Sequence, residues 1–289
     1  MRRLLAGLVL LGATLAVSAA NASQVIGSGS VSGVELAVNG KGQALLSYTV
    51  DGRAVHVLAS GAVNAVAPTA HGRQVALSLA YGRGARTGAF TCPSYTGPAL
   101  ADMLAACTAP DGSDWAVQSW DRDLPSYGVT PTPAEARSEL HLAHWTGALP
   151  VLAVHADWAY RGRWNHLWGT YTYDGGGVYG FRLTAAGVPL DSFGRNVYLD
   201  TYDSAYGPGW KRLNSLVTHA PGGSWCYLVS PHGTRPAGAG SSYRLTVIGP
   251  GVTPDLSVTV PAPGPYSKSG QASDDAALRA LDDPRCAVR

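Results

Sequence analysis

Two groups of polar residues in the second half of the chain have types and spacing that could support catalysis. The first is His155 and Asp157, which lie two residues apart in a segment with strand character, so both would face the same side. A carboxylate beside an imidazole can orient the ring for acid–base work, and the structural alternative is a surface hydrogen bond on a half-buried strand. Because no nucleophile in a recognisable turn accompanies the pair, the sequence favours the structural interpretation.

The second group is Asp200 and Asp203, with Asp191, Arg195 and Asn196 nearby in the sequence. Two carboxylates about 5–10 Å apart could hydrolyse a glycosidic bond, or they could collect calcium. Residues three apart in a strand point to opposite faces, so a turn would have to intervene, and a calcium loop needs more oxygen ligands in a tighter run. The sequence therefore favours solvated loop acids and no cofactor, with calcium as an alternative.

His141 and His144 are a candidate metal pair only if they lie on a helix, where residues three apart share a face. In the strand that we expect here they face opposite ways, so we predict no metal site. The chain also lacks a G-x-S-x-G elbow, an H-E-x-x-H helix, a Walker loop and a dinucleotide-binding glycine pattern. These absences favour a non-catalytic protein over an enzyme.

The region between residues 158 and 210 is dense in tryptophan and tyrosine, whose faces can stack on the C–H faces of sugars while neighbouring polar groups bond the hydroxyls. The alternative is that these rings build the core, since the chain has only 3 phenylalanines. The candidate ligand-binding residues are Trp164, Trp168, Tyr171, Tyr173, Arg182, Tyr202 and Trp210.

Short alternating segments bounded by turn residues predict the strands that would position these side chains. The segments at 43–50 and 53–59 flank Asp51-Gly52, a strong hairpin signal, and those at 34–38 and 74–80 extend them into a meander. Residues 169–174 and 178–183, joined by three glycines, predict a second hairpin. The sequence therefore predicts a mainly β, antiparallel β-sandwich-like architecture of two packed β halves, with one or two short helices.

Three segments have helical patterns. Residues 97–107 place Leu100, Met103, Leu104 and Cys107 on one stripe, which predicts a helix fastened by its cysteine. Residues 132–135 fit a capping box and predict one helical turn. Residues 273–281 predict a helix with Ser273 as its N-cap and acids in the first turn.

The first 22 residues have the order of a secretory signal peptide: two arginines, an apolar run and a small-residue A-x-A site before Ser23. The apolar run is too short for a membrane span, and we expect no transmembrane segment after cleavage. Beyond it we expect a β-rich half at 23–150, an aromatic-rich β half at 151–260, and a proline-rich linker and short helix at 261–289. A secreted protein, extracellular or associated with the cell envelope, is therefore predicted.

Composition and cysteine number agree with an exported globular protein. With 46% apolar residues the chain can bury a core, and a net charge of +2 gives no argument for nucleic acid. Four cysteines predict two disulfides, with three possible connectivities. No pair of cysteines has the close sequence spacing that zinc sites use. We favour Cys92–Cys107, whose short loop is worth about 3 kcal/mol by chain entropy, and Cys226–Cys286.

Several runs give the chain a resemblance to a group of proteins. Two long runs extend from residues 149–152 to residues 166–173 and from residues 194–198 to residues 206–210. The shorter ones are Tyr243-Arg244 and residues 247–255. In these runs the chain resembles uncharacterised secreted proteins of high-GC Gram-positive bacteria. The resemblance implies secretion and transfers no functional residue.

The sequence thus favours a non-catalytic extracellular or envelope-associated protein. Our hypothesis for its partner is extracellular polysaccharide or cell wall, bound through the aromatic surface. One alternative is a secreted glycoside hydrolase that uses carboxylates. Another is a structural or protein-binding surface protein.

Overall fold

The computed structural model describes residues 24–66, 75–82, 89–121, 132, 137–183, 189–213, 217–218, 222–229, 240–249 and 253–287. The side chains of residues 180–183, 189, 217 and 218 are not described. The expected signal peptide at 1–22 and the expected helical turn at 132–135, apart from residue 132, lie outside the described residues.

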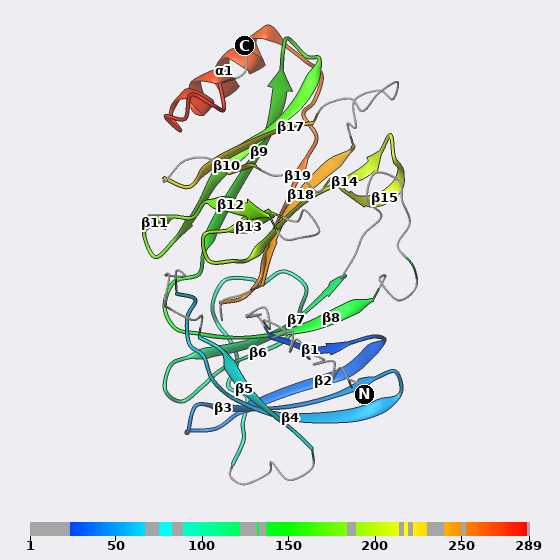
Figure 1. The fold of residues 1–289 in the computed structure, drawn as a ribbon, viewed down its shortest axis with the longest axis vertical. Helices are drawn as coiled ribbons and strands as arrows, with labels where there is room; N and C mark the ends of the chain where they lie inside the picture. The colour runs from blue at the N-terminus through cyan, green and yellow to red at the C-terminus, as the bar shows by residue number, and fades with distance from the viewer. Residues whose placement is uncertain are drawn as a thin grey trace, which may run out of the picture.

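The described chain is mainly β, as the sequence predicts, and forms two β-sandwiches placed end to end (Figure 1). The strands of the first sandwich form two antiparallel four-stranded sheets. One sheet has the order β2 (Val31–Val38), β3 (Gln43–Val50), β4 (Arg53–Gly61) and β5 (Leu77–Tyr81). The other has the order β1 (Gln24–Ser28), β8 (Ser138–Trp145), β7 (Asp114–Asp121) and β6 (Met103–Thr108).

The core of the first sandwich is an apolar cluster that draws on both of its sheets. Leu46 of β3 and Val57 of β4 meet Leu140 and Leu142 of β8 there, all fully buried. The hairpin predicted around Asp51 is confirmed by the β3–β4 pairing. Asp51 and Gly52 both have positive φ, 47° and 77°, which the tight turns of β-hairpins require.

The second sandwich begins at β9 and consists of two further antiparallel sheets. One has the order β11 (Gly176–Gly177), β10 (Trp164–Tyr173), β17 (Ser224–Val229) and β16 (Val217–Thr218), with β9 (Val151–Ala159) also paired to β10. The other has the order β12 (Gly180–Leu183), β13 (Pro189–Asp191), β14 (Asn196–Ser204), β18 (Ser242–Ile248) and β19 (Leu256–Pro261), with β15 (Gly207–Arg212) paired to β14.

The predicted helix at residues 97–107 is wrong. Residues 103–108 form strand β6, paired with β7, and the side chains of Met103 and Leu104 are exposed. The helical stripe is therefore not a buried face: of its four members only Cys107 is fully buried, in the first core. Pairing with β7 supplies backbone hydrogen bonds that the local pattern could not anticipate.

The predicted hairpin over residues 169–183 is only partly present. Residues 172 and 173 of β10 do turn back to pair with Gly177 and Gly176 of β11, but β12 pairs with β13 in the opposite sheet. Val178, buried in the second core, lies between these two pairings in the chain. Strand alternation is the same whichever sheet a strand joins, so the pattern alone could not show this crossing.

The C-terminal helix α1 (Lys268–Arg279) begins earlier than predicted. Its N-cap is Ser267, whose Oγ accepts a hydrogen bond from the Gly270 amide, and its first turn holds no acid. Ser273 is therefore inside the helix. Both favoured disulfides, Cys92–Cys107 and Cys226–Cys286, are present, and the second ties the segment after α1 to β17.

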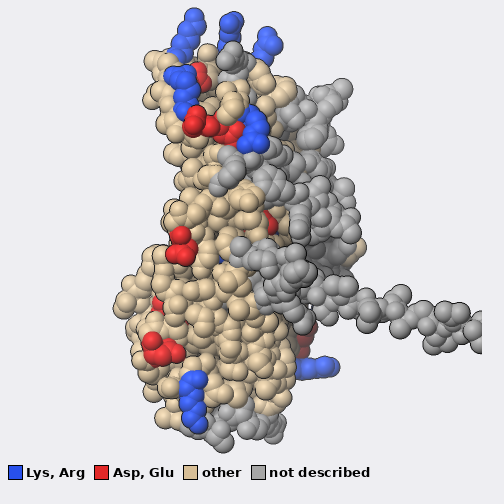
Figure 2. Space-filling view, turned by 60° about the vertical axis from the view of Figure 1, so that its left-hand side comes forward, with Lys and Arg blue, Asp and Glu red and all other residues tan. Residues whose placement is uncertain are grey.

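Charged side chains are unevenly distributed over the face in Figure 2. They gather at the end of the molecule that carries α1, while the middle of this face is mostly uncharged. No helix among the described residues is long and apolar enough to cross a membrane.

Candidate functional site

A polar cavity lies between the two sandwiches, with lining residues from both. The first sandwich contributes the turn before β6 and the end of β7, and the second contributes β14, β15 and β18. Its volume is about 310 Å³, at the lower end of the range typical of small-molecule sites. It is lined by Asp102, Met103, Leu104, Ser119, Trp120, Asp121, Asp200, Arg212, Arg244, Thr246 and Ile248.

The centre of the second-sandwich wall is Asp200, a carboxylate with 0% exposure held by two arginines. Arg212 Nε donates to Oδ1 at 3.1 Å, while Arg244 donates to Oδ2 from Nε at 3.2 Å and from Nη2 at 3.0 Å. The strand register explains the grouping, because Asp200 lies directly opposite Arg212 on β15 and Arg244 on β18. Cross-strand neighbours share a face of the sheet.

Aromatic rings extend this wall on both sides along the same sheet face. The guanidinium of Arg212 lies 3.8 Å from the ring centroid of Tyr198, and that of Arg244 lies 4.3 Å from that of Trp210. Trp210 in turn lies 5.0 Å from Tyr202, which is 38% exposed. These cation–π contacts fix the arginines in place and leave an aromatic edge beside the cavity.

The first-sandwich wall of the cavity carries negative charge, whereas the second-sandwich wall carries two arginines for one aspartate. Asp102 and Asp121 are both exposed at the cavity, and Met103 and Leu104, 45% and 47% exposed, add an apolar rim. The indole N–H of Trp120 is buried and has no hydrogen-bond partner among the residues that the structure describes. The cavity therefore offers acceptors on one wall, donors on the other and apolar surface at its edge, a combination suited to a polar ligand with both kinds of group.

The predicted carboxylate pair of Asp200 and Asp203 does not form around one ligand. Asp203 is exposed, has φ of 49°, and accepts a hydrogen bond from the Gly209 amide at 2.7 Å. The register of β14 against β15 shifts between Tyr202 and Ser204, so Asp203 sits in a bulge next to the connecting turn. Both carboxylate oxygens of Asp200, three residues earlier, accept hydrogen bonds from the two arginines.

His155 and Asp157 lie on one face of β9, but the partner of Asp157 is a different histidine. Asp157 is 3% exposed; its Oδ1 lies 3.1 Å from His166 Nδ1, and its Oδ2 accepts from Trp168 Nε1 at 2.9 Å. The exposed ring of His155 stacks on Trp168 with centroids 4.4 Å apart. This network is in the other sheet of the second sandwich from Asp200, so the predicted acids do not meet in one cleft.

The predicted aromatic surface is divided between core and exterior. Trp168 and Tyr171, 4% and 1% exposed, are buried, so neither ring can lie on an exposed platform. Trp164 and Tyr173 are half-buried and contact other rings, those of Tyr160 and Phe193. The side chain of Arg182 lies outside the described part of the chain. Of the predicted set, Tyr202 and Trp210 are the two beside the cavity.

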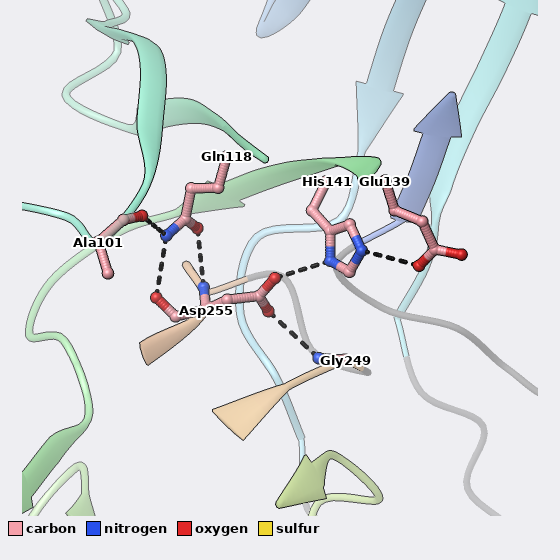
Figure 3. Close-up of polar contacts among 6 residues, drawn as sticks. All are labelled: Ala101, Gln118, Glu139, His141, Gly249 and Asp255. Atoms are coloured by element: carbon pink, nitrogen blue, oxygen red, sulfur yellow. Dashed lines mark hydrogen bonds and ion pairs between the residues drawn. The ribbon is translucent and has the colours of Figure 1, made fainter. Parts of the chain in front are cut away.

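A buried polar network joins the two sandwiches next to this cavity (Figure 3). It connects Gln118 and His141 of the first sandwich to Asp255, which directly precedes β19. Burial alone would lower the pKa of His141, but the carboxylates of Asp255 and Glu139 outweigh it and raise this pKa to about 9. The imidazole is therefore protonated at neutral pH.

His144 has a different environment, as expected for the opposite face of the strand. Its ring stacks on Trp115 with centroids 3.8 Å apart, and its nitrogens lie 2.9 Å from the Gly61 carbonyl oxygen and 2.8 Å from Ser113 Oγ. Burial lowers the pKa of His144. The two histidines share no ligand, and no group of three His, Cys, Asp or Glu side chains in the described ranges could hold a metal ion.

Sequence reasoning missed Arg212, Arg244, Gln118 and Asp255 as members of a site. Arg212 lies two residues after Trp210 in β15, and Arg244 lies two residues after Ser242 in β18, so each arginine shares a face of its strand with that residue. This alternation is a sequence signal, but it places the two arginines on one face of the sheet only once the pairing of β14 is known. Gln118 carries no such signal, because its partner Asp255 is 137 residues away.

Comparison with known proteins gives no assignment: no protein-family model, no curated protein and no solved structure matches the chain.

Proposed function

We propose that the chain is a secreted, non-catalytic protein that binds a saccharide of the cell wall or of an extracellular polysaccharide in the cavity between its sandwiches. The observation that carries this proposal is the joint placement of Trp210 and Tyr202 with the Asp200–Arg212–Arg244 group on one face of one sheet. Sugar hydroxyls both donate and accept hydrogen bonds, and sugar C–H faces pack against aromatic rings. The volume suits about one or two sugar rings.

The separation of the acids supports binding over hydrolysis. Asp157, Asp200 and Asp203 are each held by their own partners, and a glycosidase needs two carboxyl groups facing one glycosidic bond. Asp200 in particular is bound by two arginines, an arrangement that suits a fixed part of a binding wall better than a catalytic carboxylate.

The test is tryptophan fluorescence and calorimetry of the oxidised chain without residues 1–22, titrated with cell-wall fragments and soluble polysaccharides. We expect saturable binding that weakens about tenfold or more in Trp210→Ala, as for other aromatic anchors of binding sites. Trp164→Ala is the matched control, because Trp164 contacts Tyr160 in the other sheet of the second sandwich, whereas Trp210 packs on Arg244 of the cavity wall. It should leave the affinity unchanged.

Three results would count against the proposal. Loss of binding in Trp164→Ala with retention in Trp210→Ala would move the ligand to another surface. Release of new reducing ends in the same samples would favour the hydrolase. No response to any saccharide would leave a structural or protein-binding role as the better hypothesis.

A further inference from the structure

The side-chain amide of Gln118 pairs with the backbone of Asp255 in the second sandwich, with one hydrogen bond accepted and one donated, as between two paired strands. Its side-chain Oε1 accepts from the Asp255 amide at 2.9 Å, and its Nε2 donates to the Asp255 carbonyl oxygen at 3.0 Å. The same Nε2 donates to the Ala101 carbonyl oxygen at 2.7 Å, within the first sandwich. Gln118 is 1% exposed, so these bonds are formed away from water and are costly to leave unmade.

The Asp255 carboxylate makes the second connection between the sandwiches. Its Oδ1 accepts from the Gly249 amide at 3.2 Å, and its Oδ2 lies 2.7 Å from His141 Nδ1. On the other side of the ring, His141 Nε2 lies 3.3 Å from Glu139 Oε2 (Figure 3). Asp255 and His141 are 2% and 4% exposed, so this is a buried bridge.

Both ring nitrogens of His141 face carboxylate oxygens, and this geometry requires the protonated ring. An imidazolium donates from both nitrogens, whereas a neutral imidazole can donate from only one and must turn a lone pair toward the other carboxylate. Loss of the proton therefore replaces one of these two attractions with a repulsion between a ring lone pair and a carboxylate oxygen.

Other ionisable groups near Asp255 include Arg195, in the turn between β13 and β14, and Tyr171 of β10. Arg195 interacts electrostatically with Asp255, Asp191 and Tyr171 and is itself 1% exposed. Its guanidinium keeps its charge throughout the accessible pH range. Gln118, the partner on β7, does not titrate. Of these named groups, His141 is the one whose charge changes just above neutral pH.

The bridge adjoins the cavity at three points of the chain. Ala101, Gln118 and Gly249 are each the direct neighbour of a residue that lines the cavity, Asp102, Ser119 and Ile248. Asp255 also lines an apolar groove of about 620 Å³ between the sandwiches. The bridge therefore lies next to both spaces between the two sandwiches.

We propose that Glu139, His141, Asp255 and Gln118 form a proton-dependent latch that sets the relative position of the sandwiches and releases when His141 loses its proton. The sign follows from linkage. The pKa of His141 is raised to about 9 in the closed state, and opening removes the part of this increase that comes from Asp255, while Glu139 stays beside the ring on β8. The contribution of Asp255 to closure is therefore present at neutral pH and is lost as pH rises through about 9. The equilibrium constant for opening should rise with pH by up to about 100-fold, the limit that the whole shift of the His141 pKa would set.

Hydrogen exchange of two amides tests this proposal. The Asp255 amide donates across to Gln118 and reports on separation of the sandwiches, and the Gly249 amide donates to the Asp255 carboxylate within the second sandwich and reports on release of that carboxylate. Exchange of the whole oxidised chain is measured from about pH 6 to about pH 10 and corrected for the intrinsic pH dependence. We expect the protection of these two amides to fall as pH rises, by up to about 100-fold, while amides of β3 in the first core keep theirs.

Two variants give the test its controls. His141→Asn should show low protection at Gly249 and Asp255 already at pH 6, with no further fall. His144→Asn removes a buried histidine of the same strand whose described contacts, with Gly61, Ser113 and Trp115, all lie in the first sandwich, so it should retain the pH dependence. Constant protection of both amides in the unaltered chain across the pH range would overturn the proposal, even if His141→Asn did not fold.

Discussion

At the scale of single residues, the Asp200 carboxylate is a fully buried charge whose stability depends on two guanidinium groups. Asp200→Asn would remove the carboxylate that both Arg212 and Arg244 bind. Breaking a buried ion pair by removing one partner costs about 3–5 kcal/mol. We therefore expect a loss of that size in the free energy of unfolding, measured by urea denaturation of the oxidised chain.

The control for this prediction is Asp203→Asn, three residues away. Asp203 is exposed and accepts one backbone hydrogen bond, which an asparagine side chain can also accept. Its urea midpoint should change little. Equal losses in both variants would show that the ion pairs around Asp200 do not stabilise the sheet.

The composition of this group could not be predicted from the sequence, although Asp200 itself was selected. Nearness along the chain grouped Asp200 with Asp203, while its partners Arg212 and Arg244 lie 12 and 44 residues away. Only the pairing of β14 with β15 and β18 brings them together, and strand pairing depends on contacts between distant segments. By contrast, the opposite orientation of His141 and His144 followed from strand geometry alone.

At the scale of elements, α1 is a short helix whose position depends on few contacts. Gln271 Nε2 donates to the Trp158 carbonyl oxygen, Leu278 packs against Trp168, and the Cys226–Cys286 disulfide closes the segment. A 12-residue helix is marginal by itself in water. The disulfide also spans 60 residues, for which chain entropy gives about 4 kcal/mol.

Opening that disulfide should therefore free α1 before it affects the sandwiches. In a Cys226→Ser, Cys286→Ser double variant, we expect trypsin to cleave after Arg279, in the last turn of α1, at least about tenfold faster than in the unaltered chain. The control is the rate at which trypsin cleaves within the two sandwiches, which should be the same in the double variant and in the unaltered chain. Unchanged cleavage after Arg279 would mean that side-chain packing alone holds the helix.

Element type was predictable where local pattern and tertiary pairing agree. The alternation at residues 43–50 and 53–59 with Asp51-Gly52 between them predicts the hairpin, and both disulfides followed from grouping the cysteines by half. The segment at 97–107 misled because its apolar spacing fits a helix, whereas pairing with β7 makes its last part a strand. The start of α1 was missed because Ser273 and Ser267 both have N-cap chemistry.

At the scale of the whole molecule, the two sandwiches have separate apolar cores. The cluster in the first includes Leu46 and that in the second includes Leu199, both fully buried, and the clusters share no residue. Each sandwich has roughly the size at which a single core can sustain a domain. The described polar contacts between them centre on the latch, so packing inside each sandwich should determine its own unfolding.

Calorimetry of Leu46→Ala and Leu199→Ala tests this separation. Each substitution removes a fully buried side chain from one core only and should cost that sandwich about 2–5 kcal/mol. We expect Leu199→Ala to lower the unfolding temperature of the second sandwich and leave the first near its original value, with the reverse for Leu46→Ala; hydrogen exchange assigns each transition. A single transition that both variants lower equally would show that the interface joins the sandwiches into one cooperative unit. In that case the latch would have to contribute more to global stability than its few hydrogen bonds indicate.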